Sequence, residues 1–190
     1  KYQGKLLMFD NPRDAFAIAE SMLGYSFNTE DEQEFKNCAD LLATQSPVLQ
    51  GYVMDQIFDR MERGEAWAAP YYAGDYLTMV EENPDLGFSH PKEGFNIFID
   101  AMCIPKGCQN KAGAEAFINF LCDPEVAAQN AEYIGYSTPN AAALEILGEE
   151  YINDPTYNPP QELLDKCEIF HDLGDFITVY NDAWNRIKAQ

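Results

Sequence analysis

The sequence predicts an α/β protein, and three observations lead to this fold class. Residues 1–10 contain a short apolar run that is typical of a strand, and similar runs recur along the chain. Between them lie helix-start signals, the clearest being Asn11-Pro12, which combines a side-chain acceptor at the cap with proline in the first turn. A length of 190 residues is enough for one well-cored domain, or for one large and one small lobe.

The first half of the chain is expected to alternate helices with short strands. The first helix begins at Asn11-Pro12 and ends at Gly24. Residues 29–32 have the pattern of a capping box with Thr29 at the cap, and they start a second helix that runs to about Leu42. Further helices are expected at residues 53–63 and 73–82. Further strands are expected in the apolar segment of residues 66–72, until Pro70 interrupts it, and at residues 86–89. The apolar face of the first helix consists of Phe16, Ile18, Ala19, Met22 and Leu23.

The second half of the chain changes to paired helices with little sheet. Residues 111–121 have the apolar stripe of an amphipathic helix, and Asp123-Pro124-Glu125 is the start signal of the next one. Pro139-Asn140 predicts a turn, and a last helix is expected from about residue 175 to residue 188.

The charge of the chain narrows the choice of partners. Thirty-two acidic residues stand against 12 basic ones, which leaves a formal net charge of -20. This excess makes nucleic acid or an anionic membrane surface a poor partner and favours a cationic one, although it also keeps a protein soluble. No apolar run is long enough to span a bilayer.

Signatures of a metal site, a bound cofactor or a known catalytic motif are missing from the sequence. The five cysteines are an odd number, and Cys103 and Cys108 have no second Cys/His pair that would complete a zinc set. There is no phosphate-binding glycine loop and no motif of a serine hydrolase or zinc protease. No cofactor or metal is therefore expected, and an enzyme would have to rely on carboxylates, as a glycosidase does.

Asp100 is the residue that most strongly suggests a ligand. It lies in the apolar run of residues 97–105, which we expect to be a buried strand. A lone carboxylate in such a strand must be paired, neutralised or presented to a ligand. Phe98 lies two residues earlier and therefore on the same side of the strand, so an aromatic ring and a carboxylate point together. This combination suits an alkylammonium ion.

Two segments of the chain are especially distinctive, the stretch from Pro91-Lys92-Glu93-Gly94 to Asp100 and the Gly-Tyr-Ser-Thr-Pro-Asn turn at residues 135–140. They closely resemble the polyamine-binding proteins of bacterial ABC importers, the spermidine/putrescine receptors, and the resemblance covers essentially the whole chain in order. Further similar segments are residues 8–14, 23–29, 104–105, 116–127 and 134–140.

The resemblance implies a periplasmic-binding-protein fold of the second type, with two lobes and the ligand in the cleft between them. Residues 1–98 and 141–190 would form most of the second lobe, and residues 99–140 would be a helical segment of the first lobe. By this resemblance the chain is expected to be a C-terminal fragment of a longer extracytoplasmic receptor, either periplasmic or tethered at the cell surface.

Binding residues are also implied by the resemblance, and they fall into three kinds. Asp14 and Asp100 would be carboxylates for an amine, whereas Asn11 stands where the family commonly has another carboxylate. The aromatic walls would be Tyr72, Phe98 and Tyr136, and Phe170 or His171 stands where the family offers an amide, which alters the preference among polyamines.

Each of these residues except Asp100 also has a structural interpretation. Asp14 can serve only the positive end of its helix and Asn11 only its cap, Tyr72 and Tyr136 can be core aromatics, and His171 can be a surface residue.

The function implied is capture of a polyamine without chemistry, followed by recognition of the closed receptor by the importer's membrane subunits. A fragment would leave apolar surface uncovered, so self-association is expected. One alternative is a receptor for another small cationic or neutral solute, and a second, of another class, is a carboxylate-based hydrolase. A purely structural interaction module would leave Asp100 unexplained.

Overall fold

The structure is a computed structural model that describes residues 1–189, and the chain forms two compact units. Unit 1 comprises Lys1–Tyr71, Met79–Phe98 and the chain from Gln161 onward, and unit 2 comprises Tyr72–Thr78 and Ile99–Pro160. Helix α4 (Ala73–Glu82) contributes its first turns to unit 2 and its last turn to unit 1.

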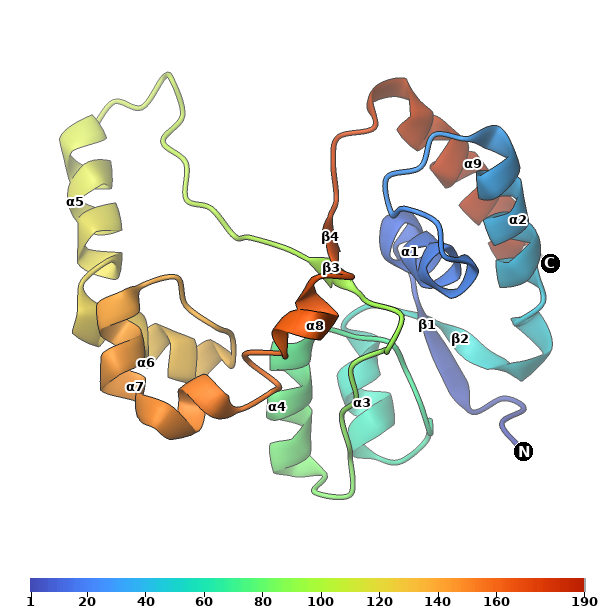
Figure 1. Ribbon diagram of the computed structural model, residues 1–190, viewed down its shortest axis with the longest axis horizontal. Helices are drawn as coiled ribbons and strands as arrows, with labels where there is room; N and C mark the ends of the chain where they lie inside the picture. The colour runs from blue at the N-terminus through green and yellow to red at the C-terminus, as the bar shows by residue number, and fades with distance from the viewer. Residues whose placement is uncertain (190) are drawn as a thin grey trace. The chain divides into compact units, whose positions relative to one another are not determined.

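Unit 1 is built on a pair of parallel strands with helices beside it. Strand β1 (Leu6–Phe9) pairs with β2 (Leu49–Val53), and the chain passes between them through α1 (Pro12–Leu23) and α2 (Glu32–Ala43). Helix α9 (Ile177–Lys188) packs against both α1 and α2, as Figure 1 shows in red beside the two blue helices. Strands and helices therefore share one unit, in agreement with the predicted α/β class.

Two apolar groups form the core of unit 1. Phe16 of α1 stacks on Phe35 of α2 at a ring distance of 4.6 Å, and Tyr180 of α9 lies 5.1 Å from Phe16. These contacts hold the three helices together, because large aromatic side chains contribute most of the buried area at such junctions. The second group joins the two strands to α3 (Gln56–Glu62) and to the last turn of α4. Its buried members are Leu7, Val53, Ile57, Ala66 and Met79.

The start of α1 follows directly from its sequence. The Asn11 side chain accepts a hydrogen bond from the backbone N–H of Arg13, Pro12 is the first helical residue, and Gly24 ends the helix with a φ of 74°. The capping residue predicted for α2 was wrong. Asp31, and not Thr29, caps this helix, with its carboxylate accepting from the backbone N–H groups of the next turn.

Unit 2 contains three helices, α5 (Lys111–Leu121), α6 (Pro124–Ile134) and α7 (Ala141–Asn153), which follow one another as neighbours (Figure 1). Helix α7 was not expected, because Pro139-Asn140 suggested only a turn. In the structure the Asn140 side chain accepts from the Ala143 backbone N–H, so the turn residue is also a helix cap. The buried side chains between α6 and α7 are small: Ala127, Ala128 and Ala143.

The strand predictions were less successful than the helix predictions. Residues 66–72 make a single bridge, from Ala68 to Leu6, and residues 86–89 form no strand. The helix predicted at residues 53–63 is in fact the last residue of β2 followed by α3.

The long strand expected at residues 97–105 shrinks to β3 (Asn96–Ile97), which pairs with β4 (Glu168–Ile169), just after the short helix α8 (Gln161–Leu164). A strand requires a partner along its whole length, and β4 supplies only two residues.

None of the helices within residues 1–189 is long and apolar enough to cross a bilayer. In the same residues, no cluster of three or more His, Cys, Asp or Glu side chains is arranged to hold a metal ion.

Candidate functional site

The predicted binding residues fall into two groups, because each unit contains part of the set. Unit 1 holds Asn11, Asp14, Phe98, Phe170 and His171, and unit 2 holds Tyr72, Asp100 and Tyr136.

In unit 1 the first turn of α1 follows the carboxyl end of β1 and carries Asn11 and Asp14. The Asn11 side-chain oxygen accepts from the Arg13 backbone N–H at 3.0 Å, so this oxygen is already used for capping. Asp14 is buried, with 6% of its surface exposed. A carboxylate is costly to bury unless it is paired or hydrogen-bonded, so the position requires partners for Asp14 and is not that of an ordinary surface residue.

Arg13 connects this turn of α1 to the predicted residue Phe170. Its guanidinium lies 4.6 Å from the centre of the Phe170 ring. One of its terminal nitrogens also donates to the Phe27 carbonyl at 3.1 Å and to the Asn28 side-chain oxygen at 3.0 Å. The helix that carries Asp14 is therefore linked through Arg13 to Phe170 and to the loop before α2.

His171 and Phe98 are both exposed residues of unit 1. The His171 backbone N–H donates to the Asn28 side-chain oxygen at 2.7 Å. Phe98 follows β3 directly and has 45% of its surface exposed. The exposed position of His171 also fits the structural interpretation of a surface residue, and the exposure of Phe98 differs from the buried strand predicted for it.

In unit 2 the Tyr136 ring lies against the backbone at the start of α4. A Cβ atom added at Gly74 would lie only 2.2 Å from Cε2 of Tyr136, so only glycine permits this approach. Gly135 makes a close contact from the other side, since a Cβ there would lie 3.2 Å from the Gly74 carbonyl oxygen. Two glycines therefore set the position of the Tyr136 ring.

Two carboxylates act on the Tyr136 hydroxyl. Burial raises the pKa of Tyr136 to about 12, with further contributions from Asp75 and Asp100, while backbone hydrogen bonds of Gly74 and Asp75 oppose the rise. Tyr136 is thus a neutral phenol near two negative charges. Carboxylates beside an aromatic face are the groups that bind an alkylammonium ion.

Asp75 was missed by the sequence analysis. It lies in the first turn of α4, three residues after Tyr72. Residues three apart at a helix start lie on one face, so the pair of an aromatic and a carboxylate was a signal available in the sequence. An acidic residue in the first turn of a helix also has the common explanation of a favourable interaction with the helix dipole, so the pair by itself does not indicate a site.

The environment predicted for Asp100 was wrong. Asp100 and its neighbours Ile99 and Met102 are exposed, and no strand continues past Ile97. The buried strand that made its carboxylate unusual does not form, because β3 has only two paired residues. Asp100 instead contributes, as a minor cause, to the raised pKa of Tyr136.

The family described as "Bacterial extracellular solute-binding protein" matches residues 1–159 of the chain. Among curated proteins, the chain is 34% identical over 189 residues to a spermidine/putrescine-binding periplasmic protein of Escherichia coli, and 28% identical over 197 residues to a putrescine/cadaverine-binding protein of Pseudomonas aeruginosa. Both matches cover 100% of this chain but only 54% and 56% of the relatives, so the chain spans about half their length.

Solved structures agree with the sequence matches. A spermidine/putrescine ABC transporter substrate-binding protein of Streptococcus pneumoniae is similar with a TM-score of 0.89 and 33% identity, over 99% of this chain and 58% of that one. A putative spermidine/putrescine ABC transporter protein of Listeria monocytogenes is similar with a TM-score of 0.88 and 35% identity, over 98% of this chain and 58% of that one. The predicted periplasmic-binding-protein fold is confirmed by these structures.

Proposed function

Because the chain belongs to the family of bacterial extracellular solute-binding proteins, we propose that it provides binding residues of a receptor that captures putrescine or spermidine for an ABC importer. The single observation that carries this proposal is the group in unit 2 where the Tyr136 ring packs against Gly74 at the start of α4, near the carboxylates of Asp75 and Asp100. The names of the relatives from Escherichia coli and Pseudomonas aeruginosa support the choice of polyamines. Assignment of residues 99–140 to one lobe and of the rest to the other stays a prediction.

The chemistry of a polyamine explains why this group of residues suits it. Each ammonium group must exchange its water shell for oxygen acceptors, and carboxylates give the strongest hydrogen bonds of this kind. The methylene chain between the ammonium groups packs on aromatic faces, which Tyr72, Tyr136 and Phe98 would offer. Such a site captures its ligand unchanged, so no catalytic residue is required.

Asn11 is neutral where the resemblance expects a carboxylate, but Asp75 offers a carboxylate elsewhere. The oxygen of Asn11 already accepts from the Arg13 backbone N–H, so this side chain is a weak partner for an ammonium group. Asp75 adds a carboxylate that the sequence analysis did not count. With Asp100 it makes two carboxylates in unit 2, which matches the charge of a diamine. Phe170 and His171 would then influence which polyamine is preferred.

Transport would depend on the difference in ligand affinity between two states of the receptor. A ligand shifts a conformational equilibrium only by binding one state better than the other, and membrane subunits of the importer would recognise the ligand-bound state. A location outside the cytoplasm agrees with the description of the family.

We also propose that the chain self-associates through an apolar surface of unit 2. Phe117 and Phe120 of α5 are 60% and 55% exposed, and Ile146 of α7 is 54% exposed. Exposed apolar side chains in such number favour association. Light scattering after gel filtration should show a dimer or larger species that Phe117→Asn with Phe120→Asn makes monomeric. Met22→Asn, at a 64% exposed position of unit 1, is the matched control. A wild-type monomer at all concentrations would refute the proposal.

Calorimetric titration tests the binding function. The protein would be a chimaera in which this chain replaces the matching part of the Escherichia coli relative, with folding checked by circular dichroism. We expect saturable binding of putrescine or spermidine, weakened roughly 10- to 100-fold by Asp100→Asn, the size expected for one hydrogen bond to a charged group. Asp182→Asn, at an exposed position of α9, is the charge-matched control and should bind like the parent.

Absence of binding by a folded chimaera would refute the polyamine assignment. The next candidates would then be other small cationic or neutral solutes. Equal affinity of Asp100→Asn and the parent would remove Asp100 from the site.

A further inference from the structure

We infer that Asn28 is a positioning residue, which holds residues 168–171 in place beside the first turn of α1 and thereby sets the affinity for the ligand. This inference rests on the proposed function. Asn28 does not belong to the predicted binding set, and it lies in the loop of residues 24–31 that connects α1 to α2.

The Asn28 side chain makes four hydrogen bonds, each to a group near a predicted binding residue. Its oxygen accepts from the Arg13 guanidinium at 3.0 Å and from the His171 backbone N–H at 2.7 Å. Its nitrogen donates to the Ile169 carbonyl at 2.9 Å and to the Glu168 carboxylate at 3.2 Å. One amide therefore joins α1 to the chain that carries Phe170 and His171.

Only an amide satisfies all four partners at this position. An aspartate would keep the two acceptor bonds but would face the Glu168 carboxylate with a second negative charge. An aliphatic side chain would leave the Arg13 and His171 donors without this acceptor. Ser26 reinforces the arrangement, because its hydroxyl donates to the Glu168 carboxylate at 2.6 Å. Asparagine meets the requirement of all four partners, because its NH2 group can donate two hydrogen bonds and its carbonyl oxygen can accept two.

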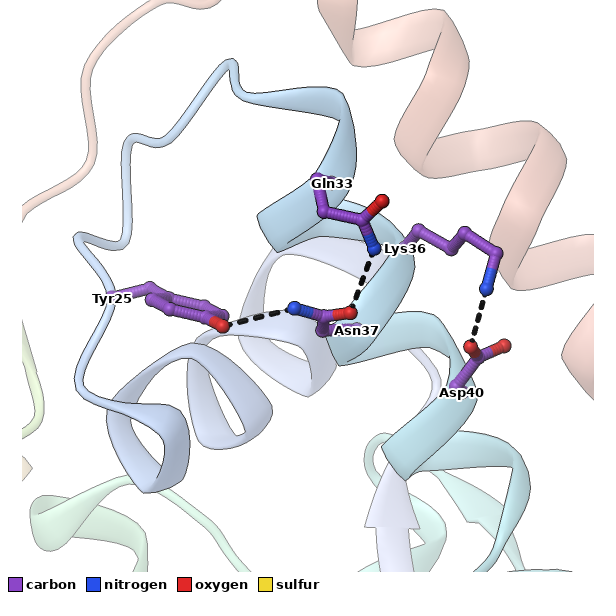
Figure 2. Close-up of polar contacts among 5 residues, drawn as sticks. All are labelled: Tyr25, Gln33, Lys36, Asn37 and Asp40. Atoms are coloured by element: carbon purple, nitrogen blue, oxygen red, sulfur yellow. Dashed lines mark hydrogen bonds and ion pairs between the residues drawn. The ribbon is translucent and has the colours of Figure 1, made fainter.

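The loop that carries Asn28 is also fixed at its other end. Figure 2 shows the Asn37 side chain of α2 donating to the Tyr25 hydroxyl at 3.0 Å and accepting from Gln33 at 3.0 Å. Tyr25 is the second residue of the loop of residues 24–31. Helix α2 therefore fixes the start of the loop through Asn37, and Asn28, later in the loop, holds residues 168–171. Asn37 thus offers a matched control, since it is an amide that stabilises the same loop without touching residues 168–171.

Loss of the Asn28 amide would free both groups that it joins. Arg13 would keep its bond to Phe27 but lose its connection to the loop side chain. Residues 168–171 would keep the β3–β4 pairing, the Ser26 contact and the ring contacts of Phe170 with Phe27 and Arg13, but no hydrogen bond would hold the His171 backbone N–H to the loop. Phe170 and His171 would then sample several positions, and ligand affinity would fall. Residues that orient the ligands of metal sites contribute on the order of 10-fold or more to affinity, and we expect a loss at the lower end of that range here.

Two measurements test the inference independently of each other. In NMR hydrogen exchange on the 190-residue chain, the His171 amide should be protected in the wild type, in Asn28→Asp and in Asn37→Ala, but unprotected in Asn28→Ala. In the calorimetric titration of the chimaera with putrescine and spermidine, Asn28→Ala should bind on the order of 10-fold more weakly, whereas Asn37→Ala should bind like the parent.

The outcomes separate this inference from the proposed function. Protection of the His171 amide in Asn28→Ala, or binding by Asn28→Ala as tight as by the parent, would overturn the role of Asn28 while polyamine binding stands. No binding by the folded parent would instead refute the proposed function, and the affinity role of Asn28 with it.

Discussion

Glu20→Gln should make the protein more stable at neutral and alkaline pH, because Glu20 is a carboxyl group buried in the core of unit 1. It lies on α1 with 0% of its surface exposed. One carboxyl oxygen accepts from the Tyr180 hydroxyl at 2.6 Å, and within residues 1–189 the other oxygen has no hydrogen-bond partner. Burial raises the pKa of Glu20 from 4.5 to about 7.

The charged groups around Glu20 act in both directions on its pKa. The Tyr180 hydrogen bond and Arg13 lower it, while Glu168 and Glu34 raise it. Cys38 of α2 is close enough for Glu20 to raise the pKa of its thiol, although burial contributes more. Desolvation of the carboxylate changes the pKa of Glu20 more than these neighbours do, and it raises the pKa. The folded protein therefore binds the Glu20 proton more tightly than the unfolded chain does.

The size and direction of the effect follow from proton linkage. The penalty for ionising Glu20 is absent below about pH 4.5, grows as the pH rises from 4.5 to 7, and is complete above about pH 7. A rise in pKa from 4.5 to about 7 corresponds to about 3 kcal/mol in the free energy of unfolding. Glutamine avoids this penalty because it carries no charge at any pH.

Urea denaturation from pH 4.5 to pH 8 measures the effect, with the fluorescence of buried Trp184 as the signal from unit 1. The stability of Glu20→Gln minus that of the wild type should rise by about 3 kcal/mol over this range. Subtracting the stability of the wild type from that of the variant removes the pH dependence that the other titrating groups cause, because those groups are the same in both proteins. Glu32→Gln, at an exposed position of α2, is the control for loss of a carboxylate outside the core, and its difference should change much less than that of Glu20→Gln. A constant or falling difference for Glu20→Gln would refute the assignment of a raised pKa to this carboxyl.

Three further predictions concern the tyrosine site and the buried cysteine. Gly74→Ala should lower the free energy of unfolding by about 1–3 kcal/mol, because the new methyl group would overlap the Tyr136 ring, whereas Gly107→Ala, which has open space, should have little effect in the same urea titration. Asp75→Asn should lower the pKa of Tyr136 from about 12, since it removes a negative charge, and NMR titration of ring-labelled tyrosine would report an unchanged pKa if the two groups do not interact. Cys38 is fully buried, and burial raises the pKa of its thiol to about 12, so it should react with a thiol reagent only when unit 1 unfolds. Exposed Cys103 is the internal reference, and rapid reaction of Cys38 in the native protein would contradict its position in the core.

Helices were predicted well where their signals are local. Asn11, Pro12 and Gly24 mark both ends of α1, and α4 and α5 have the bounds that their apolar spacing indicated. Caps and terminating glycines act within a few residues, so the sequence contains their whole cause. The apolar face predicted for α1 was only partly right, since Phe16 and Ala19 are buried but Met22 is 64% exposed.

Strands and the tyrosine site depended on partners far away in the sequence. Strand β2 was missed and the strand through Asp100 was overestimated, because a strand exists only where another one pairs with it. The Asp75 contribution was missed for the same kind of reason, since its effect on Tyr136 exists only once Gly74 and the ring meet.

By itself the sequence determined the α/β class, the family resemblance, the acidic character of the chain and most helix boundaries, because composition and capping are properties of short stretches. Only the tertiary structure decided that Glu20 is buried while Met22 is exposed, that Asp100 follows a short strand, and that the Asn28 amide joins α1 to residues 168–171. The physical reason is that burial and long-range hydrogen bonding depend on which segments meet in space. Contacts of this kind set the pKa of Glu20 and would set the affinity of the proposed site.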